Sequence, residues 1–210
     1  MVEPITIRNN EQYLRKVSAD FNMHDPNLKS IIGVMKKYCL DSGALAISGV
    51  QLGIPKRIIY LRNTDLDSVN RIQNGCATPK DEKHDEEKVI INPIILERYG
   101  LTKYWESCVS TIDLCSNVER PYLMLVNYID EYKDVKEEWF EGFEATVLSH
   151  EIDHLDGVLH MDKALDVVSI PANNRRHLRQ AEGFKIVRKE DEYEDLITKE
   201  EQKILMRKKY

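Results

Sequence analysis

The segment from Phe143 to Gly157 constrains this chain most, because a helical pattern there carries three side chains that can act together. It reads FEATVLSHEIDHLDG. His150 and His154 are four residues apart, and residues at that spacing lie one turn apart on the same face of an α-helix. Their imidazoles can therefore bind one metal ion, and Glu151 beside them can take a proton from water. Gly157 is typical of the residue that follows the end of a helix.

The third ligand of such a site is open between two residues. His160 completes the longer pattern H-E-x-x-H-x-x-G-x-x-H of a class of zinc peptidases. Those proteins also carry a methionine turn well downstream, whereas here Met161 follows His160 at once and Met206 lies among lysines and arginines. Cys108, in the segment YWESCVS, is the alternative. A Cys-His-His set would leave one coordination position open, as catalytic zinc sites do.

Composition argues against several other classes of protein. The 210 residues, 42% of them hydrophobic, suffice for one domain with a core. The net charge of −6 argues against a nucleic-acid partner. No apolar run approaches the roughly 18 residues of a membrane span, and the N-terminus lacks the apolar region of a secretory signal. The four cysteines match no C-x-x-C site, so we expect reduced thiols in a cytosol-like compartment.

The rest of the chain predicts strands gathered before the helix. Apolar residues at helical spacing predict an earlier helix over residues 27–41. Strands are expected at 57–61, 89–99, 122–130 and 135–143, with an edge or a bend at Pro93. A polar, charged stretch predicts a solvated loop over 68–88, and a short helix is expected at 198–210. This order predicts an α+β fold.

Three motifs in order make the chain resemble the peptide deformylases. Their metal-binding helix carries H-E-x-x-H, often as HEIDHLDG, which is residues 150–157 here. Their motif E-G-C-L-S is matched by ESCVS at 106–110, and their motif G-φ-G-φ-A-A-x-Q by ALAISGVQ at 44–51. The flanking segments LGIPKRIIY and VIINPIIL are similar too. The resemblance implies antiparallel β-sheets packed around a central metal-binding helix, with a catalytic domain over 1–165 and a charged, partly helical extension over 166–210.

The resemblance implies a metal-dependent amide hydrolase that removes the N-terminal formyl group from formylmethionine of newly made polypeptides. The implied metal ligands are Cys108, His150 and His154. Fe²⁺ is the implied metal, and Zn²⁺, Ni²⁺ or Co²⁺ can occupy the same ligand set. Glu151 would be the general base. The Gln51 side-chain amide and the Val109 backbone N–H would donate to the oxygen that becomes negatively charged.

The resemblance also implies where the substrate lies. The peptide backbone would run as an added strand along Leu45, Ala46 and Ser107. Thr146, one turn before the first histidine, would wall the methionine pocket together with Val147. A threonine is an unexpected polar residue in such a pocket.

A supporting pair and several departures from the family motifs complete the comparison. Glu106 would pair with Arg120 and fix the strand that presents Cys108; the alternative is a surface salt bridge worth under about 1 kcal/mol. Six motif positions depart from the family pattern: Ala44, Ala46 and Ser107 replace glycines, Ser48 and Gly49 replace alanines, and Val109 replaces a leucine. Side chains in place of glycine would narrow the peptide groove.

The partner implied is a formylated nascent peptide, with the ribosome as one place of encounter, and neither nucleic acid nor a membrane is expected to bind. The expected location is the cytoplasm. An organelle is the alternative if a transit peptide has been removed, since organellar translation also starts with formylmethionine. Two other functions stay open: a zinc peptidase that uses His160, and a catalytically weak relative that binds N-terminal peptides.

Overall fold

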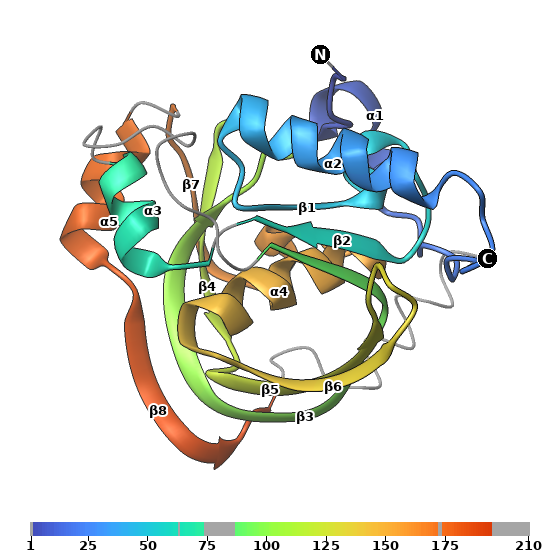
Figure 1. Ribbon diagram of the computed structural model, residues 1–210. Helices are drawn as coiled ribbons and strands as arrows, with labels where there is room; N and C mark the ends of the chain where they lie inside the picture. The colour runs from blue at the N-terminus through green and yellow to red at the C-terminus, as the bar shows by residue number, and fades with distance from the viewer. Residues whose placement is uncertain (1, 63, 74–86, 172–173, 195–210) are drawn as a thin grey trace.

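A strongly curved antiparallel sheet wraps around one central helix (Figure 1). The computed structural model describes residues 2–62, 64–73, 87–171 and 174–194. Within these ranges the helices are α1 Ile7–Leu14, α2 Leu28–Ser42, α3 Leu66–Gln73, α4 Gly142–Leu155 and α5 Arg175–Glu182. The strands are β1 Ala46–Ser48, β2 Ile58–Leu61, β3 Lys88–Ser107, β4 Leu114–Arg120, β5 Leu123–Ile129, β6 Val135–Glu141, β7 Ala164–Ser169 and β8 Lys185–Glu192. The α+β class predicted from the sequence is confirmed.

The long strand β3 joins the parts of the sheet, because it pairs in turn with β2, β5, β8 and β4. It bends at Asn92 and Pro93, where Asn92 has φ 52° and the register with β5 shifts. The Asn92 side chain accepts a hydrogen bond from Phe21 N at 2.7 Å and donates one to Phe21 O at 3.1 Å. The proline therefore marks the predicted bend, and the strand carries on past it for fourteen residues to Ser107.

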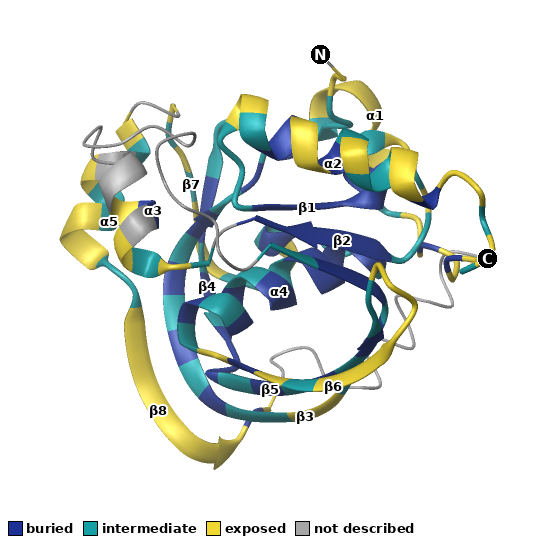
Figure 2. Ribbon diagram, viewed as in Figure 1, coloured by how far each residue is buried: buried dark blue, intermediate teal, exposed yellow. Residues whose placement is uncertain are grey.

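Helix α4 lies inside the curve of the sheet and forms the centre of the core. Figure 2 shows it buried along most of its length. Its apolar side packs against β2, β3, β5 and β6 in one cluster, whose helix members are Ala145, Leu148, Ile152 and Leu155. Burial of each larger side chain contributes roughly 1.5–3 kcal/mol. A metal-binding motif on this helix is therefore held by the most buried element of the molecule.

Helix α2 covers β1 and β2 on the side away from α4, and its outer face is exposed (Figure 2). Met35 and Cys39 are fully buried against Ile47 and Ile58 of the two strands. The helix predicted over 27–41 is thus confirmed to within a residue at each end. Gly43 ends it in the left-handed region, with φ 74° and a hydrogen bond from its N–H to Cys39 O.

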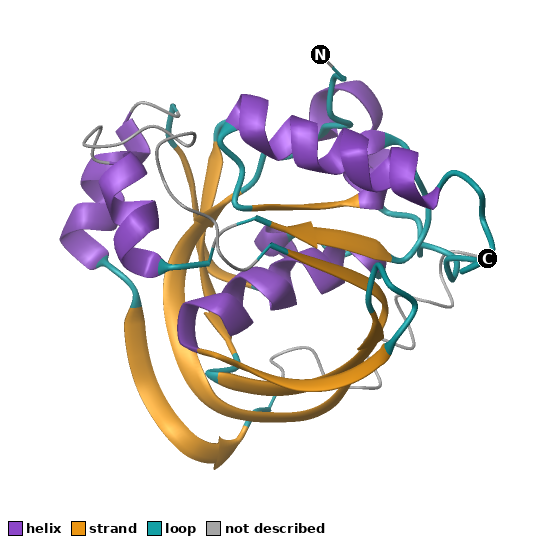
Figure 3. Cartoon of the chain, in the orientation of Figure 1, coloured by secondary structure: helices purple, strands orange, loops and turns teal. Residues whose placement is uncertain are grey.

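The prediction of a loop over 68–88 is wrong at its start, because α3 runs to Gln73 (Figure 3). Val69 is fully buried beside Tyr104 and Phe143, so packing against the sheet stabilises this short helix. Residues 74–86, and the helix predicted at 198–210, lie outside the described residues. None of the helices in the described ranges combines the length and apolar character that a membrane crossing requires.

Besides α3, two helices and four strands were not anticipated: α1, α5, β1, β4, β7 and β8. Strand β8 is exposed at every position, and its pairing with β3 between Tyr99 and Lys103 holds it in place. The described residues between 166 and 194 thus contribute most of β7, together with α5 and β8, both of which contact β3. The division of the chain at residue 165 stays a prediction.

Candidate active site

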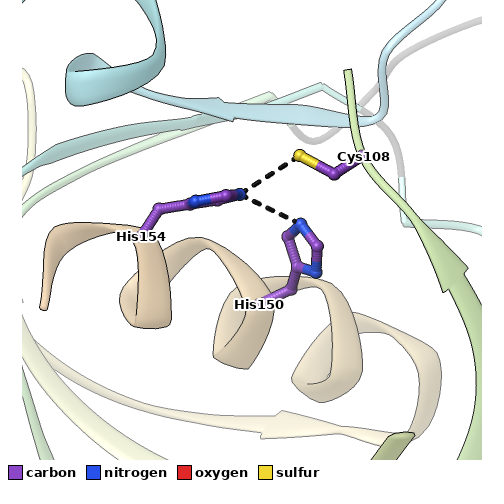
Figure 4. Close-up of side chains that lie close together, drawn as sticks. All are labelled: Cys108, His150 and His154. Atoms are coloured by element: carbon purple, nitrogen blue, oxygen red, sulfur yellow. Dashed lines mark hydrogen bonds between the residues drawn. The ribbon is translucent and has the colours of Figure 1, made fainter. Parts of the chain in front are cut away.

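Three predicted metal ligands converge between α4 and the turn that follows β3 (Figure 4). His154 Nε2 lies 3.2 Å from His150 Nε2 and 3.2 Å from Cys108 Sγ. The helix supplies the histidines one turn apart. Strand β3 ends at Ser107, and the turn closed by Thr111 N and Cys108 O directs the thiol toward the helix. All three side chains are buried.

The residues fit a metal ion on two independent grounds. Ligand atoms of a tetrahedral Zn or Fe site with bonds near 2.0–2.3 Å lie about 3.3–3.6 Å apart, close to the separations here. His150 Nδ1 lies 2.8 Å from Glu106 Oε2, so the ring keeps a proton on that nitrogen and turns a lone pair of Nε2 to the centre. Burial lowers the pKa of His154, which favours the neutral ring that binds a metal.

A buried network of charges holds the first histidine and the strand behind it. Arg120 donates to both carboxylate oxygens of Glu106, at 2.8 and 2.9 Å, and also to Asp153. Lys163 donates to the second Asp153 oxygen at 2.9 Å. Burial alone would raise the pKa of Glu106, but Arg120 and His150 hold it well below its usual range. The predicted Glu106–Arg120 pair is confirmed, and with exposures of 5% and 1% it is a buried pair, not a surface salt bridge.

The candidate general base, Glu151, is buried next to the ligand cluster, with 5% exposure. The Ser48 hydroxyl lies within hydrogen-bond distance of both its carboxylate and its backbone oxygen. Burial raises the pKa of Glu151, against the opposing effects of His150 and Ser48. A carboxylate with a raised pKa holds a proton more readily, as a base working near neutral pH requires.

The candidate oxyanion donors, Gln51 and Val109, both lie close to the Cys108 thiol. Gln51 Oε1 accepts a hydrogen bond from Ser48 N at 2.9 Å, which turns the amide nitrogen toward Cys108 Sγ at 3.1 Å and Ser110 Oγ at 3.2 Å. Val109 lines the same cavity. The amide N–H groups of Gln51 thus face the centre and can donate to a substrate oxygen there.

His160 lies outside the ligand cluster. Among the described residues the group that includes both helix histidines is completed by Cys108. His160 Nε2 lies 2.7 Å from Thr111 Oγ1, its ring stacks on that of His150 at 5.7 Å, and burial and nearby His150 lower its pKa to about 3. The Thr111 hydroxyl also reaches Cys108 O at 3.3 Å. His160 therefore braces the turn that carries the thiol.

A cavity of about 520 Å³ opens beside this cluster and contains every predicted substrate-binding residue: Leu45, Ala46, Ser107, Thr146 and Val147. Tyr104 and Phe143 add an aromatic wall, with ring centroids 5.3 Å apart. The Thr146 hydroxyl lies 3.1 Å from Thr102 Oγ1 and 3.3 Å from Gly142 O. The Thr146 hydroxyl is therefore hydrogen-bonded inside the protein. A threonine at this position is compatible with an apolar pocket wall, although it is a polar residue.

Sequence reasoning missed Ser48, Asp153 and two cavity-lining arginines, Arg175 and Arg179 of α5. Asp153 carried a signal, since an acid between the two histidines of a buried helix needs a partner. The departure of Ser48 from the family alanine was a second signal. The arginines lie in the basic run NNRRHLRQ, a composition typical of a solvated helix. The sequence alone does not show that this segment packs against β3.

Comparison with known proteins shows the family of this chain. A family model described as Polypeptide deformylase matches residues 2–168. A peptide deformylase of Novosphingobium aromaticivorans is 32% identical over 156 residues, covering 71% of this chain and 82% of the relative. One from Prosthecochloris aestuarii is 31% identical over 163 residues, covering 78% and 80%.

Solved structures show the same fold. A class I type b peptide deformylase from Acinetobacter baumannii, with Met-Ala-Ser bound, superposes with a TM-score of 0.65 at 26% identity, covering 78% of this chain and 98% of that one. The enzyme from Plasmodium falciparum gives 0.65 at 27% identity, covering 79% and 87%. The family match over most of the chain, together with these relatives, places the chain in the peptide deformylase family.

Proposed function

We propose that this chain hydrolyses the N-terminal formyl group of formylmethionine on newly made polypeptides, with Glu151 as the general base. Family membership supports the reaction. The observation that carries the assignment of residues is the convergence of Cys108 Sγ and the Nε2 atoms of His150 and His154 beside a buried glutamate. Peptide deformylases are metal-dependent hydrolases, and this ligand set suits a divalent metal.

Cys108, His150 and His154 would hold the metal, which would acidify water and polarise the formyl carbonyl. Glu151 accepts the proton of the attacking water and delivers it to the nitrogen of the leaving amine. Ser48 holds the Glu151 carboxylate from the side of β1. Glu151 is buried to 5% exposure and lines the cavity, so its carboxylate is within the site where the attacking water would lie.

Negative charge that develops on the formyl oxygen is stabilised by the Gln51 amide and the Val109 backbone N–H. A donor of this kind contributes about 3 kcal/mol to transition-state stability. The hydrogen bond from Ser48 N to Gln51 Oε1 fixes the amide orientation, so the donor needs no rearrangement when the charge appears. One short segment, residues 48–51, therefore orients both the base and an oxyanion donor.

The substrate peptide lies along Leu45, Ala46 and Ser107, with its methionine side chain near Thr146 and Val147. The cavity lining these residues supports this placement. The Acinetobacter baumannii relative binds Met-Ala-Ser, a peptide that begins with methionine as the product of deformylation would. Such peptides emerge at the ribosome, and the cytoplasm, or an organelle that starts translation with formylmethionine, fits the proposal.

We take Fe²⁺ as the native metal of the proposal, with Zn²⁺, Ni²⁺ or Co²⁺ as alternatives for the same ligands. The test is a formate-release assay over a panel of formyl peptides, on protein loaded anaerobically with Fe²⁺, with metal content measured on the same sample. Cys108→Ala should lose the metal. Cys115→Ala removes another buried thiol and serves as the matched control, which should keep metal and activity.

The rival functions give different results in the same assays. A peptidase that uses His160 as a ligand predicts metal loss in His160→Ala and full metal content in Cys108→Ala. A catalytically weak binder predicts metal and peptide binding without formate from any peptide. Formate release from the parent that disappears in Cys108→Ala supports the deformylase and contradicts both rivals.

A further inference from the structure

We propose that α5 makes the peptide groove selective for substrates with an acidic side chain shortly after the formylmethionine, and that Arg175 binds this carboxylate. The inference rests on the proposed function for the identity of the substrate. Helix α5 lies in the segment that follows the family match, which ends at residue 168. Two of its arginines, Arg175 and Arg179, nevertheless line the cavity beside the metal ligands.

Arg179 fastens the helix to the strand that carries the thiol. Its Nε donates to Trp105 O at 3.2 Å, its Nη2 donates to Ser107 Oγ, and its guanidinium lies over the Tyr104 ring at 5.6 Å. Phe184, just after α5, packs edge-on against Phe143 at 5.5 Å. Helix α5 is thus docked on the groove wall.

Arg175 differs, because its charge is only partly satisfied. Its Nε donates to Ile170 O at 3.3 Å, while its Nη2 is buried and has no hydrogen-bond partner among the described residues. Burial and the nearby Arg179 lower the pKa of Arg175. A buried guanidinium nitrogen without an acceptor is costly, and a carboxylate is the acceptor whose geometry it fits best.

The acids that line the cavity already have partners. Glu106 is bound by Arg120 and His150, and Glu151 by Ser48. Asp113 forms an ion pair with Arg8 at 2.8 Å, although its charge also acts on Arg175. The two arginines of α5 therefore leave an excess of positive charge at this end of the groove, which attracts an anionic group.

Arg175 and Arg179 lie one turn apart on α5, so the contact of Arg179 with β3 limits where a carboxylate bound by Arg175 can lie. Trp105, to which Arg179 bonds, precedes the ligand Cys108 by three residues. Three residues of extended chain span about 10 Å. If a peptide lies beside β3 with its formyl end at the metal ligands, its second or third residue lies near Trp105, about 10 Å from Cys108. Aspartate at either position is the substrate class that the arginines fit.

The test compares peptides that differ in charge alone. The pairs are formyl-Met-Asp-Ala-NH₂ against formyl-Met-Asn-Ala-NH₂, and formyl-Met-Ala-Asp-NH₂ against formyl-Met-Ala-Asn-NH₂; the amide ends remove the terminal carboxylate. We expect the parent to favour aspartate roughly tenfold in kcat/KM in at least one pair, mostly through KM, as for one charged hydrogen bond. The preference should shrink in 0.5 M NaCl.

Two variants assign the preference to its residue. Arg175→Gln should bring the ratio of kcat/KM for the aspartate peptide to that for the asparagine peptide to about one in the pair that the parent distinguishes. Arg188→Gln on β8, a residue outside the cavity lining whose side chain is 42% exposed, is the matched control and should keep the ratio. A ratio near one in the parent overturns the inference, and so does a ratio that survives Arg175→Gln.

Calorimetric binding of the product peptides Met-Asp-Ala-NH₂, Met-Asn-Ala-NH₂, Met-Ala-Asp-NH₂ and Met-Ala-Asn-NH₂ separates the inference from the proposed function. If the parent releases no formate from any peptide, the proposed function fails. The affinity ratio within each pair still decides the selectivity of the groove. A preference for aspartate that Arg175→Gln removes supports the role of α5, and equal affinities in both pairs contradict it.

Discussion

The two ends of the peptide groove are built in opposite ways. At the metal end, Glu106 and Asp153 both pair with the buried Arg120, and α4 and β3 hold them from the centre of the core. At the α5 end, Arg179 is anchored, and Arg175 keeps a buried nitrogen that has no hydrogen-bond partner within the described part of the chain. The paired charges around Arg120 hold the metal-site residues in a fixed geometry. The guanidinium of Arg175, which is only partly satisfied, is suited to binding an anionic group of the substrate.

The largest effect that distinguishes the two ends is expected from Glu151→Gln. The substitution keeps nearly the same size but removes the proton acceptor, so formate release should fall by roughly 10²–10⁴-fold for all peptides. Metal content should stay at the parental level, because Glu151 is not a proposed ligand. The ratio between acidic and neutral peptides should also persist in the residual activity. Loss of the metal in this variant would make Glu151 a ligand or an anchor and overturn its role as base.

The stability of the metal end is tested by Arg120→Met. The change leaves Glu106 and Asp153 without their shared partner, and breaking a buried pair costs about 3–5 kcal/mol in the free energy of unfolding. Urea unfolding followed by tryptophan fluorescence measures it. Lys103→Met, which breaks a more exposed pair with Glu119, is the control and should cost under about 1 kcal/mol. Equal losses in the two variants would contradict the central role of the Arg120 network.

The sequence predicted the metal end better than the α5 end for a physical reason. The histidine spacing is local and follows from helix geometry, while Cys108 could be assigned only by resemblance, since it lies more than forty residues earlier in the chain. The sequence of α5 has no apolar stripe that would predict packing against the sheet. The helix is held there by the contacts of Arg179 and by Phe184. Strand β8 is exposed throughout and forms because β3 offers an open edge there.

A smaller effect is expected where this chain has glycine and the family motif has alanine. A Cβ on Gly49 would lie 2.8 Å from Ile54 O and 2.9 Å from Ile58 Cγ2, so the backbone must shift. Gly49→Ala should therefore reduce the free energy of unfolding by about 1–3 kcal/mol. Gly33→Ala on α2 is the matched control: no atom lies within 4 Å of its Cβ, and alanine in a helix should stabilise by up to about 1 kcal/mol. If Gly49→Ala leaves the free energy of unfolding unchanged, the backbone before Gln51 can shift at little cost.

The smallest effect is expected from Ser48→Ala, which restores the family residue at the metal end. The loss of its hydrogen bond leaves the Glu151 carboxylate less firmly oriented, and kcat should fall by about three- to tenfold with KM little changed. Ser116→Ala is the control, since this serine is equally buried but its hydroxyl has no hydrogen-bond partner among the described residues. It should leave kcat unchanged.

Because Ser48 contacts the base and not the arginines of α5, the preference for aspartate should be the same in Ser48→Ala as in the parent. A changed preference would show that the metal end and the α5 end of the groove are coupled and do not act independently.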